Sequence, residues 1–235
     1  MATVTIIDDF IRAPSHARPG VTHPKKWIII HETCNCEPGA SAESYARYIR
    51  EVAEQDQLFL SWHYTVDDSA VYRHIPDDEV AWHAGGRKSP DGGDLAGIGI
   101  EICVNPESNF DSAVDKAARL AARLLCEHGL PVTAVRQHHD FSGGSCPRRL
   151  RQGGRWEQFM EAVRRYYGAA CAPKPLRQGG RVYVSGMLYD DSYGGTAMRR
   201  IEGEFDVTLL MEERPAGVLL DGSLGWVHSE DCTPI

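Results

Sequence analysis

Residues 27–31 read Trp27-Ile28-Ile29-Ile30-His31, an apolar run rich in isoleucine that ends on a histidine. An unbroken apolar run of this kind is typical of a strand buried on both faces, as in a sheet covered by helices. His31 follows the last isoleucine directly, so its side chain is expected to emerge at the carboxyl end of the strand. The run therefore predicts the centre of an α/β domain with a polar group at the edge of its sheet.

Strand and helix patterns alternate around this run up to residue 168. Ser41 to about Asp56 has a serine N-cap and apolar residues at helical spacing, and Ser112–His128 is an Ala/Leu/Arg-rich helix that ends at Gly129. The other predicted elements are a hairpin of strands Trp62–Val66 and Ala70–His74, the strands Gly97–Val104 and Val132–Gln137, and a helix Trp156–Tyr167 closed by Gly168. This alternation predicts an α/β domain over residues 1–168, with helices covering a sheet.

The pattern changes after residue 168. Residues 169–180 contain prolines and small residues, a composition typical of linkers. Short alternating runs separated by glycine turns follow, at Arg181–Val184, Val207–Met211, Val218–Leu220 and Gly225–His228. Short strands at close spacing predict a small all-β barrel over residues 181–235.

Composition and charge argue against several classes of function. The 235 residues carry a net charge of −8, which disfavours nucleic acid or an anionic membrane held by bulk electrostatics. No apolar stretch approaches the length that crosses a bilayer, so membrane insertion is not expected. The N-terminus carries Asp8 and Asp9 instead of the basic start and long apolar run of a secretory signal. Seven cysteines, an odd number, argue against a disulfide framework and favour synthesis in a reducing cytoplasm.

Three potential metal ligands lie where a metal could reach them. His31 and His138 each follow a predicted strand directly, and Cys146 lies eight residues after His138 in a loop. Two imidazoles and one thiolate leave one position open on a tetrahedral zinc ion, which is the pattern of a catalytic site. Each residue also has a simpler explanation, because strand-end histidines are usually surface or hydrogen-bonded residues and a lone cysteine before proline is usually inert. His139 beside His138 leaves the choice of the second ligand open.

Glu101 strengthens the catalytic interpretation. It lies between isoleucines in Gly97–Cys103, where a carboxylate is costly unless it is paired or functional. It is either a salt-bridged strand residue or a general base whose pKa is raised by burial. Trp62-His63-Tyr64 and Trp82-His83 add aromatic and imidazole groups that are expected near the same end of the sheet. Individually these could be core aromatics and surface histidines.

Five segments of the chain, in order and spacing, resemble the N-acetylmuramoyl-L-alanine amidases of the amidase-2 type. This group includes phage endolysins, Bacillus autolysins and the peptidoglycan-recognition proteins. The segments are Ile28–Thr33 (IIIHET), Ser61–Asp68 (SWHYTVDD), Ala81–Gly85 (AWHAG), Ile98–Cys103 (IGIEIC) and Ser142–Pro147 (SGGSCP). The resemblance covers about residues 12–167. It implies a mixed sheet with flanking helices, one Zn²⁺ and hydrolysis of the muramic acid lactyl–L-alanine bond in bacterial peptidoglycan.

The resemblance also implies roles for single residues. It makes His31, His138 and Cys146 the metal ligands, which selects His138 over His139, and it makes Glu101 the catalytic glutamate. His83 matches a histidine of the family's substrate groove, and Trp62 falls at an aromatic position beside it. The expected substrate-binding residues are Trp62, His63, Trp82, His83 and Arg148.

One position departs from the family pattern. Many of these enzymes have a lysine two residues before the cysteine ligand, placed to stabilise the oxyanion, and here that position is Gly144. The oxyanion then needs the metal together with another donor, for which Arg148, His63 or a backbone N–H are the candidates. The absence of one such donor typically costs about a hundred- to a thousandfold in rate.

The C-terminal part resembles bacterial SH3-like wall-binding domains, most clearly in Gly225-Trp226-Val227. Four aromatic residues are candidates to line a groove for sugar or peptide: Tyr183, Tyr189, Tyr193 and Trp226. The alternative is a structural appendage or a module that forms a homodimer.

Three functions are compatible with these observations. The leading one is a phage endolysin or host autolysin, made in the cytoplasm without a signal peptide and acting on the wall after release. Its C-terminal domain would raise the local substrate concentration by tethering. The second is a non-catalytic peptidoglycan-binding protein on the same fold, which the presence of Cys146 disfavours. The third is a cytosolic amidase that recycles wall fragments.

Overall fold

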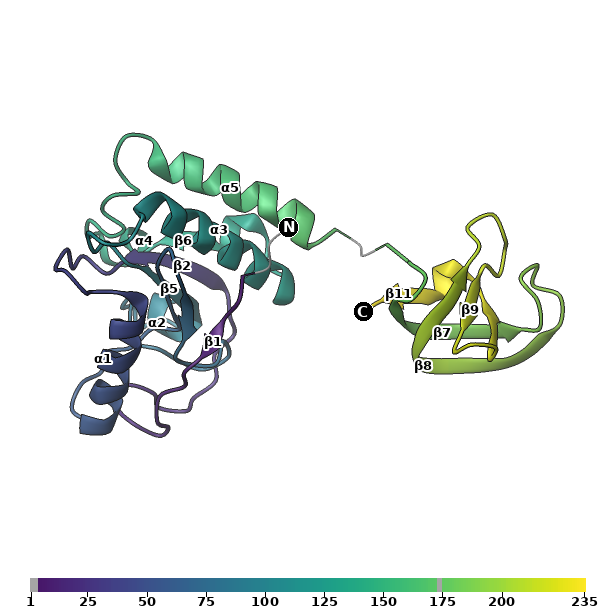
Figure 1. Ribbon diagram of the computed structural model, residues 1–235. Coiled ribbons are helices and arrows are strands. Elements are labelled where there is room, and N and C mark those ends of the chain that lie inside the picture. Colours follow the sequence, from purple (N-terminus) through teal and green to yellow (C-terminus); the bar gives the residue numbers. More distant parts are fainter. Residues whose placement is uncertain (1–3, 173–174) are drawn as a thin grey trace. The chain divides into compact units, whose positions relative to one another are not determined.

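The computed structural model describes residues 4–172 and 175–235. The chain divides into two compact units, Met1–Cys171 and Ala172–Ile235. Figure 1 shows a first unit of helices around a sheet and a second unit built almost entirely of strands. The expected linker at 169–180 falls across this division, and its Pro173 and Lys174 lie outside the described residues.

The centre of the first unit is a six-stranded mixed sheet in the order β1-β4-β3-β5-β2-β6. β2 (Trp27–Glu32) lies between β5 (Gly97–Ile102) and β6 (Val135–Gln137) and is parallel to both. β3 (Tyr64–Val66) and β4 (Val71–Arg73) form the predicted hairpin. The three isoleucines of β2 are fully buried, so the strand that the sequence placed at the centre is there. A two-residue edge strand, β1 (Ile7–Asp8), was not predicted.

Alternation along the strands separates the two faces of this sheet. Ile28 and Ile30 belong to the large core that also contains α3 (Phe110–Glu127) and α5 (Arg155–Ala170), which lie beside each other in Figure 1. Because neighbouring side chains of a strand point to opposite faces, His31 lies on the other face. A second, smaller hydrophobic core contains residues of α1 (Ala42–Gln55). α1 begins where expected, with the Ser41 hydroxyl accepting the Ser44 N–H.

Two short helices and two corrected boundaries complete the unit. α2 (Gly93–Ala96) leads into β5, and α4 (His139–Ser142) follows β6. The predicted strand Val132–Gln137 is wrong in its first half, because Val132–Ala134 forms a 3-10 turn. Gly168 does not close the last helix, which continues to Ala170, since a helical glycine costs only about 1 kcal/mol. No helix in the described ranges has both the length and the apolar character needed to cross a bilayer.

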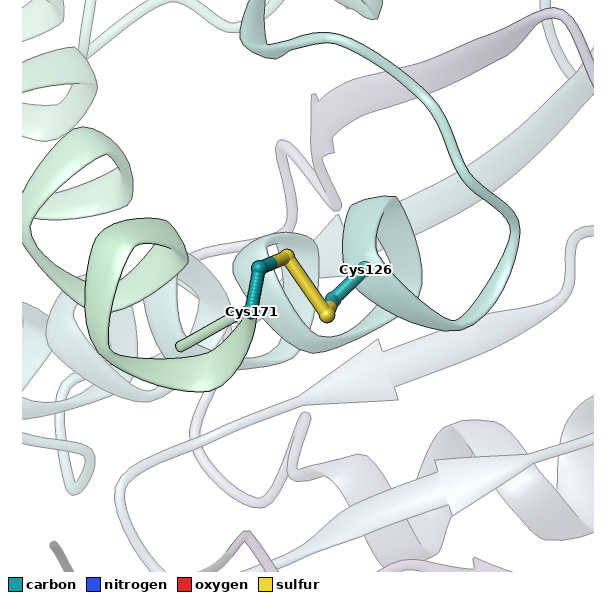
Figure 2. The surroundings of a disulfide bond; sticks show 2 residues. All are labelled: Cys126 and Cys171. Atoms are coloured by element: carbon teal, nitrogen blue, oxygen red, sulfur yellow. A yellow bond between two sulfur atoms is a disulfide. The ribbon is translucent and has the colours of Figure 1, made fainter. Parts of the chain in front are cut away.

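A disulfide joins Cys126 and Cys171 at the ends of α3 and α5 (Figure 2). Their Cα atoms are 5.5 Å apart and the two residues are 45 positions apart in the sequence. The sequence argued against a disulfide framework and did not predict this single pair. An odd cysteine count does not prevent one pair from meeting, and the packing of α3 against α5 brings these two together. The other cysteines are free: Cys34, Cys36, Cys103, Cys146 and Cys232.

The second unit is a five-stranded antiparallel sheet in the order β10-β9-β8-β7-β11. Its strands are β7 (Arg181–Tyr189), β8 (Ala197–Leu210), β9 (Val218–Leu220), β10 (Gly225–Val227) and β11 (Cys232–Pro234), with a 3-10 turn Ser229–Asp231 before the last. Trp226 of β10 also pairs with Tyr189 of β7, so strands β7 to β10 close into a ring around their own apolar core. β8 begins well before the predicted run Val207–Met211. The sequence did not reveal its first half, because that half is exposed and lacks an apolar alternation.

Candidate metal centre

The three predicted metal ligands converge at the carboxyl ends of β2 and β6. One ligand atom each from His31, His138 and Cys146 lies within 4.8 Å of the other two. β2 and β6 are parallel neighbours, so residues at their carboxyl ends meet at the same edge of the sheet. His138 is held there by its N–H, which donates to Ile30 O at 3.2 Å.

The neighbouring His139 makes hydrogen bonds to the loop that carries Cys146. Its Nδ1–H donates to Gly144 O at 2.5 Å, and its backbone N–H donates to Cys146 O at 2.9 Å. Both bonds tie the loop that carries Cys146 to the end of β6. The geometry therefore separates the two adjacent histidines, with His138 in the ligand cluster and His139 bracing the loop.

The donor set fits a zinc ion. Two imidazole nitrogens and a sulfur make three of four tetrahedral ligands and leave one position open. The Nδ1 atoms of His31 and His138 face each other at 3.0 Å. Glu101 Oε1 lies 3.7 Å from His31 Nδ1, and Glu101 Oε2 is buried without a hydrogen-bond partner among the described residues. Buried carboxylate oxygens are almost always satisfied, so this orphaned oxygen beside two facing nitrogens suits a cation site.

Glu101 is fixed by the register of the sheet. It pairs with His31 across β5 and β2 and with Thr65 across β5 and β3, and its side chain is 15% exposed. Burial raises the pKa of Glu101 to about 8, and the nearby Glu32 carboxylate adds to the effect. A cation between the histidines would lower this pKa again. A carboxylate that titrates near neutrality is suited to accept and return a proton.

Glu32 holds the cysteine loop against β2. Its carboxylate accepts the backbone N–H groups of Arg149 and Leu150, both at 2.9 Å, and its own N–H lies 3.4 Å from Cys146 Sγ. Glu32 is 4% exposed, so these backbone donors replace its lost hydration. Burial raises the pKa of the Cys146 thiol to about 12, against the effect of the Glu32 N–H, so a thiolate at this position needs a cation. Glu32 was not predicted as a site residue, although it follows His31 in a buried strand.

His83 lies against the predicted ligand His31. Its Nδ1 is 3.0 Å from His31 Nε2, and its Nε2 is 3.1 Å from Gly97 O. Asp94, only 1% exposed, holds this segment by accepting the N–H groups of His83, Ala84 and Gly85, each at 2.8 Å. Asp94 also accepts the Arg87 Nε–H at 3.1 Å. It was not predicted as a site residue, because the three bonds that hold this segment come from backbone groups, which no side-chain pattern reveals.

Two expected substrate-binding residues are interior residues. Trp62 is 5% exposed, and its Nε1–H donates to Thr65 Oγ1 at 2.6 Å. His63 is fully buried, its Nδ1 accepts the Gly99 N–H at 3.0 Å, and its Nε2–H donates to Glu79 O at 2.9 Å. No ring nitrogen of His63 remains for a substrate or an oxyanion. These positions favour structural roles over the contacts expected from the sequence.

The other two expected substrate residues can reach solvent. Trp82 is half-buried, donates its Nε1–H to His16 O at 2.7 Å and carries the Arg87 guanidinium 4.5 Å from its ring centroid. Phe59, which is 53% exposed, meets Trp82 edge-on. Arg148 is exposed, two residues beyond Cys146. Substrate contacts by Trp82 and Arg148 stay predictions.

A hollow lies beside α1. It has a volume of about 380 Å³ and is lined by Asn35, Ala40, Ser44, Tyr45 and Tyr48. Two larger hollows, of about 730 and 840 Å³, lie over the start of α3 and include none of the three ligand residues. The hollow beside α1 includes none of them either, and its Asn35 lies four residues after His31 along the chain.

The aromatic residues singled out in the second unit do not form one groove. Tyr189 pairs with Trp226, and its ring meets His228 edge-on at 5.1 Å. Tyr193, 62% exposed, carries the Arg214 guanidinium 3.8 Å from its ring centroid. Tyr183 lies six residues before Tyr189 on the same strand, about 20 Å away at the usual rise of a strand. Tyr189 and Trp226 form one cluster, and Tyr183 is separate from it.

Comparison with known proteins identifies the family. The family model described as N-acetylmuramoyl-L-alanine amidase, Amidase_2, matches residues 21–149. The amidases CwlH and XlyA of Bacillus subtilis (strain 168) are 37% and 38% identical to this chain over 160 residues. Each match covers 68% of this chain, but only 61% of CwlH and 51% of XlyA, so the chain spans between half and about three-fifths of these relatives.

Solved structures match the same part of the chain. The catalytic domain of XlyA superposes with a TM-score of 0.62 at 38% identity, covering 68% of this chain and 99% of that one. The structure of PlyL superposes with a TM-score of 0.59 at 28% identity, covering 68% and 97%. The family model lies entirely within the first unit, which holds the metal centre. The chain therefore belongs to the Amidase_2 family of N-acetylmuramoyl-L-alanine amidases.

Proposed function

We propose that this protein hydrolyses the amide bond between N-acetylmuramic acid and L-alanine in bacterial peptidoglycan, using one Zn²⁺ held by His31, His138 and Cys146. The observation that carries the proposal is the convergence of these three ligand atoms beside the partnerless oxygen of Glu101. Relatives named N-acetylmuramoyl-L-alanine amidase support the choice of bond. The match to the catalytic domain of XlyA supports placing the reaction in the first unit.

Glu101 is the group that moves the proton. Zinc, when bound, supplies Lewis-acid activation of water and of the amide carbonyl. Glu101 accepts a proton from the attacking water and delivers it to the alanine nitrogen as the C–N bond breaks. The water oxygen ends in the new lactyl carboxyl group, so the reaction needs no other reactant. Because strand register fixes Glu101 opposite His31, its carboxylate is already at the metal's edge.

Arg148 is our candidate for the donor that replaces the family lysine. Gly144 offers no side chain, and both ring nitrogens of His63 are occupied. Arg148 belongs to the same loop as Cys146, is exposed and carries a permanent positive charge. Its guanidinium can donate to a developing oxyanion above the open side of the site.

The second unit is proposed to bind the wall as an SH3-like module. Its cluster of Tyr189 and Trp226, with His228 against Tyr189 and the exposed Tyr193 beyond, offers aromatic faces to sugar or peptide. Tethering by this unit would raise the concentration of peptidoglycan at the first unit. Release of the protein to the wall after synthesis in the cytoplasm, and a homodimer formed through this unit, both stay predictions.

Mass spectrometry of digested cell walls tests the reaction. The full chain is incubated with purified walls, with and without a chelator. The expected products are peptides with a free L-alanine amino group and muramic acid with a free lactyl carboxyl group. Chelation should stop their formation, and added zinc should restore it. Binding to walls without new ends would support the non-catalytic alternative, and cleavage of soluble muropeptides but not of walls would support the recycling alternative.

A further inference from the structure

A chain of hydrogen bonds behind His31 fixes where its protons lie. Gly97 O can only accept, so His83 Nε2, 3.1 Å away, carries a hydrogen. The ring nitrogens of His83 bond another imidazole and a carbonyl, and the nearby Asp94 carboxylate binds the backbone N–H of His83 and not its ring. The ring is therefore taken as a neutral imidazole, which has a single N–H. Its Nδ1 is therefore an acceptor. His31 Nε2, 3.0 Å from that Nδ1, must be the donor.

The other nitrogen of His31 is then free for a metal. With its hydrogen on Nε2, His31 presents an unprotonated Nδ1, which faces His138 Nδ1 at 3.0 Å and Glu101 Oε1 at 3.7 Å. We propose that His83 is a positioning residue that fixes the tautomer and ring orientation of His31, so that His31 binds metal through Nδ1. This inference rests on the metal site of the proposed function. It assigns a positioning role to a residue that does not itself contact the metal.

The fold holds His83 without help from a metal. Asp94 binds the backbone N–H of His83, and the Gly97 carbonyl binds its ring. Gly99 leaves room for the ring, because a Cβ at this position would lie 2.8–2.9 Å from three atoms of the imidazole. On its far side the ring meets His63 edge-on, with the two centroids 5.7 Å apart. The acceptor for His31 is thus built by backbone groups and packing.

Outer partners of this kind set metal affinity. A ligating histidine usually donates its second N–H to a carboxylate, a carbonyl or water, and loss of that partner typically costs about 10- to 100-fold in affinity or activity. Here the partner is a neutral imidazole. It orients His31 without placing a carboxylate directly against the ligand, because Asp94 binds the backbone N–H of His83 on the next layer out.

The direct test identifies the metal-bound nitrogen in the wild-type chain. Full-length protein with ¹⁵N-labelled histidine is loaded with ¹¹³Cd, and the cadmium–nitrogen couplings are recorded by NMR. We expect coupling to Nδ1 of His31, with a hydrogen retained on its Nε2. Coupling to Nε2 of His31 overturns the proposal, and no variant is needed to reach that result.

Two substitutions separate positioning from packing. In His83→Asn the amide oxygen stands where Nδ1 is now and can still accept from His31, whereas in His83→Gln the polar atoms stand at the position of Nε2. Zinc affinity, measured by competition with a coloured chelator, should fall about 10- to 100-fold in His83→Gln and much less in His83→Asn. Equal losses in both, or no loss in either, contradict the proposal. His128→Gln is the matched control, because His128 pairs with Asp77 at the end of α3.

The outcomes also distinguish this inference from the proposed function. Thermal unfolding of the metal-free variants shows whether they fold. A wild-type chain that binds cadmium through Nδ1 of His31 but releases no new ends from walls overturns the proposed function and leaves the inference standing. A chain that cuts walls but binds through Nε2 overturns the inference alone.

Discussion

His74 makes the stability of the first unit sensitive to acid. Its side chain is fully buried, its Nε2 lies 2.8 Å from Thr65 Oγ1, and its Nδ1 has no hydrogen-bond partner within the described part of the chain. Burial lowers the pKa of His74 from 6.5 to about 4, with Asp9 opposing this change and Arg50 adding to it. The folded protein therefore keeps His74 neutral at pH values where the unfolded chain binds a proton.

The sign and size of the effect follow from this difference. Because the unfolded state binds more protons between pH 6.5 and about 4, the free energy of unfolding falls as the pH is lowered through this window. The contribution is fully present above pH 6.5 and lost by about pH 4. It amounts to about 3 kcal/mol in all, of which about 2 kcal/mol is lost by about pH 5. Typical domains have only about 5–15 kcal/mol of stability.

The assay compares the wild type with His74→Gln, whose amide can still reach Thr65 but does not titrate. Urea unfolding is followed by the circular dichroism of the helices, since all three long helices lie in the first unit. Between about pH 7.5 and about pH 5, the wild type should lose about 2 kcal/mol more than His74→Gln. Thr65→Val is the control, because it removes the hydrogen bonds to His74 and to Trp62 but keeps the buried imidazole and hence the pH dependence. Equal losses in wild type and His74→Gln would refute the reasoning.

Four further predictions concern the site and the disulfide. Cys146→Ser should lose most of its zinc and activity, and full metal content by elemental analysis would contradict the ligand assignment. Glu101→Gln should keep its zinc while turnover falls about 10²- to 10⁴-fold, and near-normal turnover would remove Glu101 from the mechanism. Arg148→Ala should lower kcat about 10²- to 10³-fold with zinc unchanged, and adding Gly144→Lys to it should restore activity; no loss would exclude Arg148 as the donor. Cys126→Ser should lower the free energy of unfolding by about 2–4 kcal/mol in urea titrations under oxidising conditions, and an unchanged midpoint would show that the disulfide does not stabilise the unit.

Elements marked by an apolar pattern, and the polar residues that directly follow them, were the easiest to predict. β2 carries buried isoleucines on both of its faces, which is why residues 27–31 could be placed at the centre of the sheet. β2 and β6 are parallel neighbours, which brings His31 and His138 to one edge of the sheet. The loop that follows His138 places Cys146 at the same edge. β1 and the first half of β8 were missed because both are exposed, so no apolar pattern marks them.

Burial and backbone partners were beyond the sequence pattern. His63 and His83 both follow a tryptophan in similar segments, yet the ring of His63 bonds only backbone groups and the ring of His83 contacts the predicted ligand His31. Glu32 and Asp94 accept from backbone N–H groups, and for Glu32 these come from residues more than a hundred positions away. Every residue type has a backbone N–H, so a sequence does not show which of them will meet a given carboxylate.

Glu32 and Asp94, together with His83, explain how the folded chain holds the three predicted ligands close together. Glu32 fixes the loop of Cys146, Gly97 and Asp94 fix His83, and His83 orients His31. The carboxylates of Glu32 and Asp94 end on backbone N–H groups, and the ring of His83 bonds the Gly97 carbonyl and His31, so hydrogen bonds of the folded chain hold the predicted ligands near one another. A site preorganised in this way would bind the proposed zinc with little rearrangement, since the cost of ordering the ligands is met when the chain folds. The same sheet that buries the isoleucines therefore also sets the distances at the metal.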